Sequence, residues 1–266
     1  MNSIHVRQPS FDFTGATGLW NPARPELSHL LNAFQLALPY LEPYFIDAVK
    51  RASEQLTDPR LKADAAAFCA QEANHARQHR QYCNSLQQRY PRLEDFEADV
   101  RRSLVASRKN DALEWRLAYT AGYEVITAQF SRILFDKQDT WLQGADEQFA
   151  ALMLWHAAEE IEHRHVAFDV LQAINPSYAL RASGFYAALK KTYEDMAPVA
   201  SYMLEVDGYA GRIDSILRRA RVRAEVAAQL VPAGARYLLP NYHPSQEDEP
   251  NGYGHWRQAQ SSAVAG

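Results

Sequence analysis

From about Leu27 onward, apolar positions recur at the three- and four-residue intervals of amphipathic helices, and few if any strands are expected. The preceding segment, 1–24, places Pro9, Gly15 and Gly18 among aromatic residues, which predicts an extended N-terminal arm that packs on the body. After Pro232 the chain is rich in Pro, Gly, Asn, Ser and acidic residues, which predicts an irregular tail over 232–266. The helical domain is therefore expected over 25–231.

Breaks in the apolar pattern divide this domain into helices. Pro39 and Pro43 fall inside the first helix and should bend or break it. Asp58 followed by Pro59 is typical of an N-cap with proline in the first helical turn. Asp111 should open a long helix. The predicted helices are 27–55, 59–90, a short one near 93–107, one from 111, one over roughly 146–173, and two further amphipathic helices near 178–204 and 209–230.

Two pairs of glutamates repeat at the spacing of a helical hairpin. Glu42 lies thirty residues before Glu72, and Glu124 lies thirty-six residues before Glu160. Each interval fits a helix, a short turn and an antiparallel return. The pattern predicts an all-α, ferritin-like four-helix bundle of two antiparallel hairpins, with a crossover near 90–110 and additional helices after 178.

The segment WHAAEEIEHRHVAFDV carries the strongest chemical signal. His156, Glu160 and His163 fall at i, i+4 and i+7, within roughly 60° of one another on a helix. Glu72 and His75 form a second such stripe, which His79 continues by one turn. Two helices that each present Glu-x-x-His, with a lone glutamate from each of two others, form the ligand set of a di-metal bundle.

The candidate metal ligands are therefore drawn from four helices. They are Glu42, Glu72, His75, Glu124, His156, Glu160 and His163. Carboxylates can bridge two cations and offset their charge, while imidazoles suit iron, zinc or copper. Two ions are expected, with iron the first choice and manganese or zinc as alternatives.

Ordinary structural roles compete with this interpretation. Glu72 and Glu160 could be members of exposed ion pairs on a helix surface. Glu124, however, lies in the nearly uncharged AYTAGYEVITAQF, where a buried carboxylate needs a strong partner. Glu162 and His165 make a third Glu-x-x-His, interpreted as a decoy because His165 points away from His156 on a continuous helix.

Other residues are expected to support the site. His79 is either a ligand or a hydrogen-bonding neighbour of one, and Tyr123 is expected beside the ligands. Glu159 flanks the stripe and is the candidate for a proton shuttle. His156 exceeds the minimal ferritin-like set and would give one metal an extra nitrogen ligand.

Composition excludes several partners. A net charge of −4 and a pI near 6.1 give no signature of nucleic-acid binding. No apolar run is long enough to span a bilayer, and the N-terminus does not resemble a signal peptide. Cys69 and Cys83 lie about 21 Å apart if one helix carries both, too far for a disulfide, so a reducing cytoplasm is expected.

The chain resembles a ferritin-like bacterial family of predicted metal-dependent hydrolases. The resemblance rests on FDFTGATGLWNP, HLLNAFQLALPYLEPYFIDAVKRA, AFCAQEANHARQH, AYTAGYEVITA, WHAAEEIEHRHVAFDV and LLPNYHPSQED. Leu41 and Pro43, which flank Glu42, depart from that family's pattern. The order of candidate ligands is also similar to that of the di-iron arylamine N-oxygenases, although this likeness covers only the ligands.

Three functions follow from these observations. The first is a di-iron oxidoreductase that activates O2 and acts on an apolar small molecule, which would need an electron donor. The second is a metal-dependent hydrolase in which a metal-bridging hydroxide attacks the substrate. The third is an iron-binding or structural metal bundle. A homodimer is the default expectation for assembly.

Overall fold

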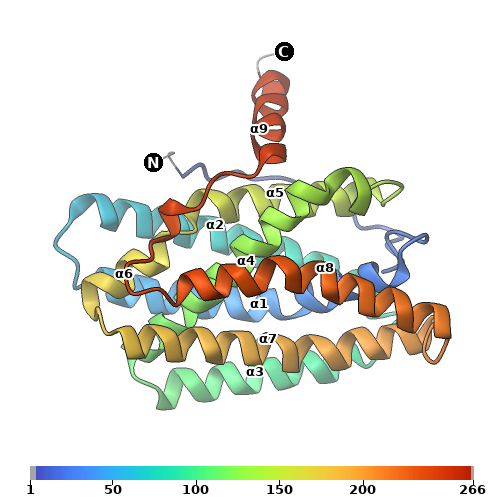
Figure 1. Cartoon of the computed structure of the whole chain (residues 1–266), viewed down its shortest axis with the longest axis horizontal. Coiled ribbons are helices and arrows are strands. Elements are labelled where there is room, and N and C mark those ends of the chain that lie inside the picture. The colour runs from blue at the N-terminus through green and yellow to red at the C-terminus, as the bar shows by residue number, and fades with distance from the viewer. Residues whose placement is uncertain (1–3, 265–266) are drawn as a thin grey trace.

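The computed structural model describes residues 4–264, and no strand occurs among them. The bundle consists of α1 (Pro25–Ser53), α2 (Pro59–Leu86), α4 (Leu113–Trp141) and α5 (Glu147–His163). Helix α1 packs along α2 and α4 packs against α5 (Figure 1). The predicted all-α, ferritin-like bundle of two hairpins is confirmed. The crossover between the hairpins contains α3 (Leu93–Asn110).

Helix α1 is unbroken across both of its prolines, contrary to the expected break. A proline at position i has no N–H for the carbonyl of residue i−4, so Pro39 and Pro43 leave the carbonyls of Gln35 and Pro39 without helical donors. Side chains of α2 supply donors instead. The Cys83 thiol lies 3.6 Å from the Gln35 carbonyl, and Arg80 Nη2 donates to the Pro39 carbonyl at 3.0 Å.

The helix expected over 146–173 is divided in two. Helix α5 ends at His163, and α6 (Val166–Ile174) starts after a turn at Arg164 and His165. The Arg164 guanidinium donates to the carbonyls of Ile161, Pro244 and Glu247, which ties this turn to a distant segment of the chain. That tie depends on tertiary structure and has no local signature in the sequence.

Two long helices cover the bundle. They are α7 (Tyr178–Val206) and α8 (Ile213–Tyr237), close to the predicted 178–204 and 209–230. Helices α4 and α7 cross at glycines: a Cβ on Gly122 would lie 2.6 Å from Phe185 Cα, and one on Gly184 would lie 2.4 Å from the Ala118 carbonyl carbon. This close approach fixes α7 against the bundle.

The ends of the chain lie over the second hairpin. Residues 4–24 precede the first helix, and Trp20 stacks on Phe149 with ring centroids 4.2 Å apart. The segment expected to be an irregular tail includes the end of α8, the short 3-10 helix η1 (Pro244–Gln246) and α9 (Asn251–Val264). Helix α9 projects from the body in Figure 1, and its base packs on Phe135 through Tyr253. Within the described part of the chain, no helix has both the length and the apolar character needed to cross a bilayer.

Candidate metal centre

The structure brings all seven predicted ligands into one buried cluster. Helix α1 contributes Glu42, α2 contributes Glu72 and His75, α4 contributes Glu124, and α5 contributes His156, Glu160 and His163. None is more than 3% exposed. The alternative in which Glu72 and Glu160 form exposed ion pairs is therefore wrong.

One half of the cluster surrounds His163. Its Nε2 lies 3.2 Å from Glu72 Oε1, 3.2 Å from Glu124 Oε2 and 3.5 Å from Glu160 Oε2. Ligand atoms of Glu72, Glu124 and His163 lie within 4.8 Å of one another. The two carboxylates and the imidazole thus converge on a volume suited to a single cation.

The other half contains two imidazoles. His75 Nδ1 lies 3.5 Å from Glu72 Oε1 and 3.6 Å from Glu160 Oε1. His156 Nε2 lies 2.9 Å from Glu160 Oε1 and 3.9 Å from Glu42 Oε1. Glu72 and Glu160 contact the imidazoles of both halves, so either carboxylate could help to hold a cation in each half.

Seven of the buried polar atoms that face this cluster lack hydrogen bonds. The atoms without a hydrogen-bond partner include both carboxylate oxygens of Glu42, Oε1 of Glu72, Nδ1 of His75, Oε2 of Glu124, Oε2 of Glu160 and Nε2 of His163. Unpaired buried groups of this kind are costly, and native structures rarely keep several together. Four carboxylates also balance the charge of two divalent cations, so the donor set fits such ions.

Mutual repulsion perturbs the acidic groups of the cluster. Burial and the neighbouring carboxylates raise the pKa of Glu72 and of Glu124 to about 8, and raise the pKa of Glu42 well above its usual range. Burial also acts on Glu160, but His163 and His156 outweigh it and hold the pKa of Glu160 well below its usual range. A cation would replace the protons that the raised carboxyl groups hold.

Hydrogen bonds from behind fix which nitrogen of each imidazole faces the cluster. Glu159 Oε2 lies 3.1 Å from His75 Nε2, so that nitrogen carries the proton and Nδ1 offers its lone pair to the cluster. The Gln71 amide oxygen lies 2.9 Å from His163 Nδ1 and accepts from it, so Nε2 faces the cluster. Burial lowers the pKa of His163, but Glu160 and Glu124 outweigh it and raise this pKa well above its usual range, so a cation would displace the Nε2 proton. Both arrangements are those that metal-ligating histidines adopt.

His79 is placed to orient the His156 ring in the same way. Its Nδ1 lies 3.0 Å from the Gln35 amide oxygen, and its Nε2 lies 3.1 Å from His156 Nδ1. His156 Nε2 also lies 2.9 Å from the ionised Glu160 Oε1, to which it donates while no cation is bound. A cation at His156 would require the other tautomer, in which the His79 proton is on Nδ1, His79 Nε2 accepts from His156 Nδ1, and the His156 Nε2 lone pair is free to bind. Burial lowers the pKa of His79 and of His156, which favours the neutral rings that this relay needs.

The N-terminal arm braces these supporting groups through Arg7. Its Nη1 lies 3.2 Å from Glu159 Oε1, and its Nη2 lies 2.6 Å from Glu162 Oε1. Glu162 Oε2 in turn accepts from Gln71 Nε2 at 3.1 Å. Sequence reasoning missed Arg7, Gln71 and Gln35. Only the position of Gln71 directly before Glu72 could have indicated it.

Three residues considered from the sequence have other positions. Glu159 is fully buried with both oxygens bonded to Arg7 and His75, and these contacts outweigh burial and lower its pKa, so its position favours orienting His75 over shuttling protons. The Tyr123 ring packs on Phe45 and Tyr119 and adjoins Thr192 of α7 rather than the candidate ligands. His165 lies in the turn between α5 and α6, outside the candidate groups found among the described residues.

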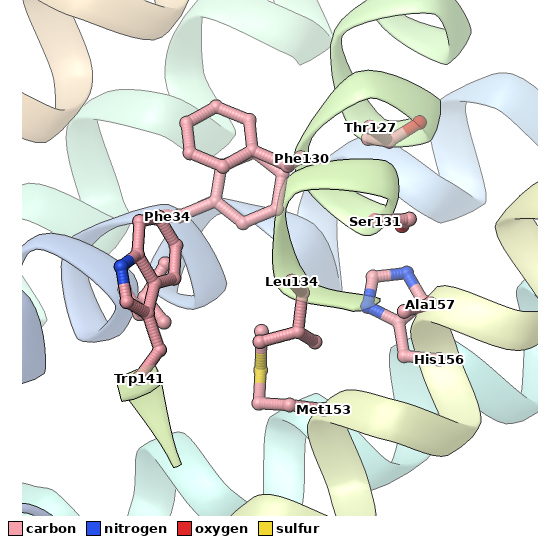
Figure 2. Close-up of a pocket in the computed structure, with 10 residues that line it drawn as sticks. Phe34, Thr127, Phe130, Ser131, Leu134, Trp141, Met153, His156 and Ala157 are labelled. Atoms are coloured by element: carbon pink, nitrogen blue, oxygen red, sulfur yellow. The ribbon is translucent and has the colours of Figure 1, made fainter. Parts of the chain in front are cut away.

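A small pocket adjoins the His156 side of the cluster. Its volume is about 10 Å³, and Figure 2 shows His156 on one side of it, with Phe34, Phe130 and Trp141 on the other. Met153 and Leu134 complete an apolar wall, and the hydroxyl groups of Thr127 and Ser131 lie on the α4 side. This space is about that of one water molecule.

The fold and the cluster define a ferritin-like bundle with a candidate two-cation site of carboxylates and imidazoles. The chain belongs to the family described as predicted metal-dependent hydrolase, whose model matches residues 5–248. Neither a search of the curated proteins nor a search of the solved structures finds a match. The resemblance to this family, inferred from the sequence, is confirmed.

Proposed function

We propose that the chain is a metal-dependent hydrolase whose centre holds two divalent cations. The observation that carries the proposal is the convergence of unpaired, buried donor atoms from Glu42, Glu72, Glu124, Glu160, His75 and His163. His156 completes the ligand set through Nε2. The family description supports hydrolysis.

Glu72 and Glu160 are proposed to bridge the two cations. One cation would lie among His163 and Glu124, and the other among His75, His156 and Glu42. His79 is proposed to support His156 rather than bind, since its Nε2 lies within hydrogen-bond distance of His156 Nδ1. Bound cations would supply Lewis-acid chemistry by polarising a carbonyl or phosphoryl oxygen.

The chain's own groups have separate tasks. Glu159 and Gln71 accept from the rear nitrogens of His75 and His163, and would keep the other nitrogen of each ring available to a cation. The apolar wall of Phe34, Phe130 and Trp141 limits water near His156. Because Glu159 is held by two hydrogen-bond partners, we propose that it positions His75 and does not itself transfer protons.

A matched pair of substitutions tests the proposal. Glu160→Gln removes a bridging charge and should lower bound metal from about two ions per chain to less than one, with loss of cleavage of a panel of esters, amides and phosphate esters. Glu97→Gln changes a buried glutamate of α3 that bonds Tyr40, and should leave metal content unchanged. Elemental analysis makes the comparison. Fewer than one ion in the native chain would contradict the metal site.

An O2-activating di-iron oxidoreductase is the second candidate, favoured by the third imidazole, His156, in one half of the cluster. Oxygen consumption by the ferrous protein, together with inactivity on every hydrolytic substrate when zinc or manganese is bound, would establish it over hydrolysis. An apolar small molecule is the proposed substrate for either reaction. A homodimer stays a prediction, and an electron donor is needed only for the oxidative reaction.

A further inference from the structure

A larger cavity shares Phe130 with the small pocket at His156. Its volume is about 620 Å³, within the range of small-molecule sites, and α1, α4, α7 and α8 all contribute to its walls. The walls are almost wholly apolar, with Val125, Phe185, Met196 and Leu230 among the lining residues. The cavity can therefore hold an organic molecule, whereas the small pocket has room for about one water molecule.

Phe130 is the partition between the two spaces. It lines both of them, and its ring stacks on Phe34 with centroids 4.8 Å apart. In Figure 2 the two rings lie together across the small pocket from His156. A change of the Phe130 rotamer would therefore join the cavity to the space beside the metal cluster.

The lining indicates what the cavity can hold. Arg223 is the only charged residue that lines it, and that side chain is exposed. Leu189, Tyr193 and Val231 line the cavity while 43%, 67% and 69% exposed, so apolar surface continues from the interior to the rim. Apart from Arg223, the polar lining side chains are Gln129, Thr192 and Tyr193, so a polar substrate would lose more hydration here than these few partners replace. A long alkyl or acyl chain would bury apolar surface along the whole path.

We propose that this cavity binds the apolar chain of the substrate, with the polar end directed past Phe130 toward His156. The hydroxyl groups of Thr127 and Ser131 lie on that side and suit a polar end group. The assignment of the polar end rests on the proposed function of the cluster. The binding of the chain does not, because the cavity lies outside the ligand set.

Fatty acids of increasing length test the binding in the metal-free and the metal-loaded protein. Affinity measured by titration calorimetry should rise by up to about fourfold per methylene group. Ala227→Phe, which narrows the cavity from α8, should weaken binding by about tenfold. Ala228→Phe alters the neighbouring exposed position outside the lining and should leave it unchanged. Affinity independent of chain length would overturn the proposal without relying on either variant.

Spin-labelled stearic acids test the orientation. Trp141 lines the small pocket, so a nitroxide near the carboxyl end should quench its fluorescence, and a nitroxide near the methyl end should not. The difference between the native chain and Trp141→Phe isolates that signal. Quenching by the methyl-end label alone, or by neither label, overturns the orientation.

Neither measurement needs metal or turnover, so failure of the proposed hydrolysis would leave the binding result intact. A second copy of this chain could also cover the apolar lining of the cavity. Sedimentation in the same buffers tests whether the chain self-associates. If fatty acid competes with self-association and binds only to the monomer, with no dependence on chain length, this lining is an interface between copies and the proposal is wrong.

Discussion

The imidazoles of the cluster are each held by a neutral or anionic acceptor behind the ring, and this choice of acceptor decides where the lone pair lies. Gln71 is a sharp example, because its own amide orientation is set by donation to Glu162 and to the His5 carbonyl. The oxygen is then the only atom left to accept from His163 Nδ1. Glu162 thus sets the orientation of the Gln71 amide, and the Gln71 amide in turn holds the proton of His163 on Nδ1.

Gln71→Leu removes that acceptor, and a neutral His163 ring can then keep its proton on Nε2, toward the cluster, rather than on Nδ1. Metal affinity should fall by roughly tenfold or more, as it does when such supporting hydrogen bonds are lost. Gln81→Leu makes the same substitution at an exposed position of α2 and should have no effect. Competition with a metal-binding dye measures both affinities. Equal affinities in the two variants would show that Gln71 has no orienting role.

Proton release is the second expectation at this scale. Because the folded pKa values of Glu72 and Glu124 lie near 8, above the ordinary 4.5, their contribution to metal-free stability is present below pH 4.5 and is lost as pH rises through about 8. Metal binding needs both groups ionised, so affinity should increase with pH up to about 8. Titration calorimetry in buffers of different ionisation enthalpy should detect released protons. Binding that is independent of pH between 4.5 and 8 would contradict these shifts.

Among the helices, the tightest constraint is the α4–α7 crossing. Gly122→Ala would place a Cβ 2.6 Å from backbone of α7, so the helices must separate, at a cost of about 1–3 kcal/mol in the free energy of unfolding. Gly254→Ala, in α9, meets no atom within 4 Å and should be neutral or slightly stabilising. Denaturant unfolding of the two variants makes the test. A neutral Gly122→Ala would show that the crossing can relax.

The spacing of glutamate and histidine residues along the sequence made the bundle and its seven candidate ligands predictable. Glutamates thirty and thirty-six residues apart report a hairpin return, and a Glu-x-x-His stripe reports a helix face, because both depend only on helical geometry. The break after His163 and the base of α9 were not predictable, since Arg164 and Tyr253 are held by residues distant in sequence. Tyr123 was misplaced because its ring lies on the α7 side of α4.

The whole molecule should gain stability when the centre fills. Ions that bind only the folded chain add about 2.7 kcal/mol at a concentration one hundred times the dissociation constant of one site. Removal of metal with a chelator should therefore lower Tm by several degrees, and zinc, manganese or ferrous iron should restore it. Glu160→Gln should show little response to either treatment. A Tm that is the same with chelator and with metal would contradict a structural contribution of the cluster.

The two prolines of α1 also have a consequence for how the chain folds. Helix α1 lacks two of its own backbone donors, and Cys83 and Arg80 of α2 replace them. An isolated α1 segment is therefore deficient in hydrogen bonds until its partner helix arrives. The first hairpin should form in one cooperative step, so that Glu42 joins Glu72 and His75 at the same moment that the helix carrying it becomes stable.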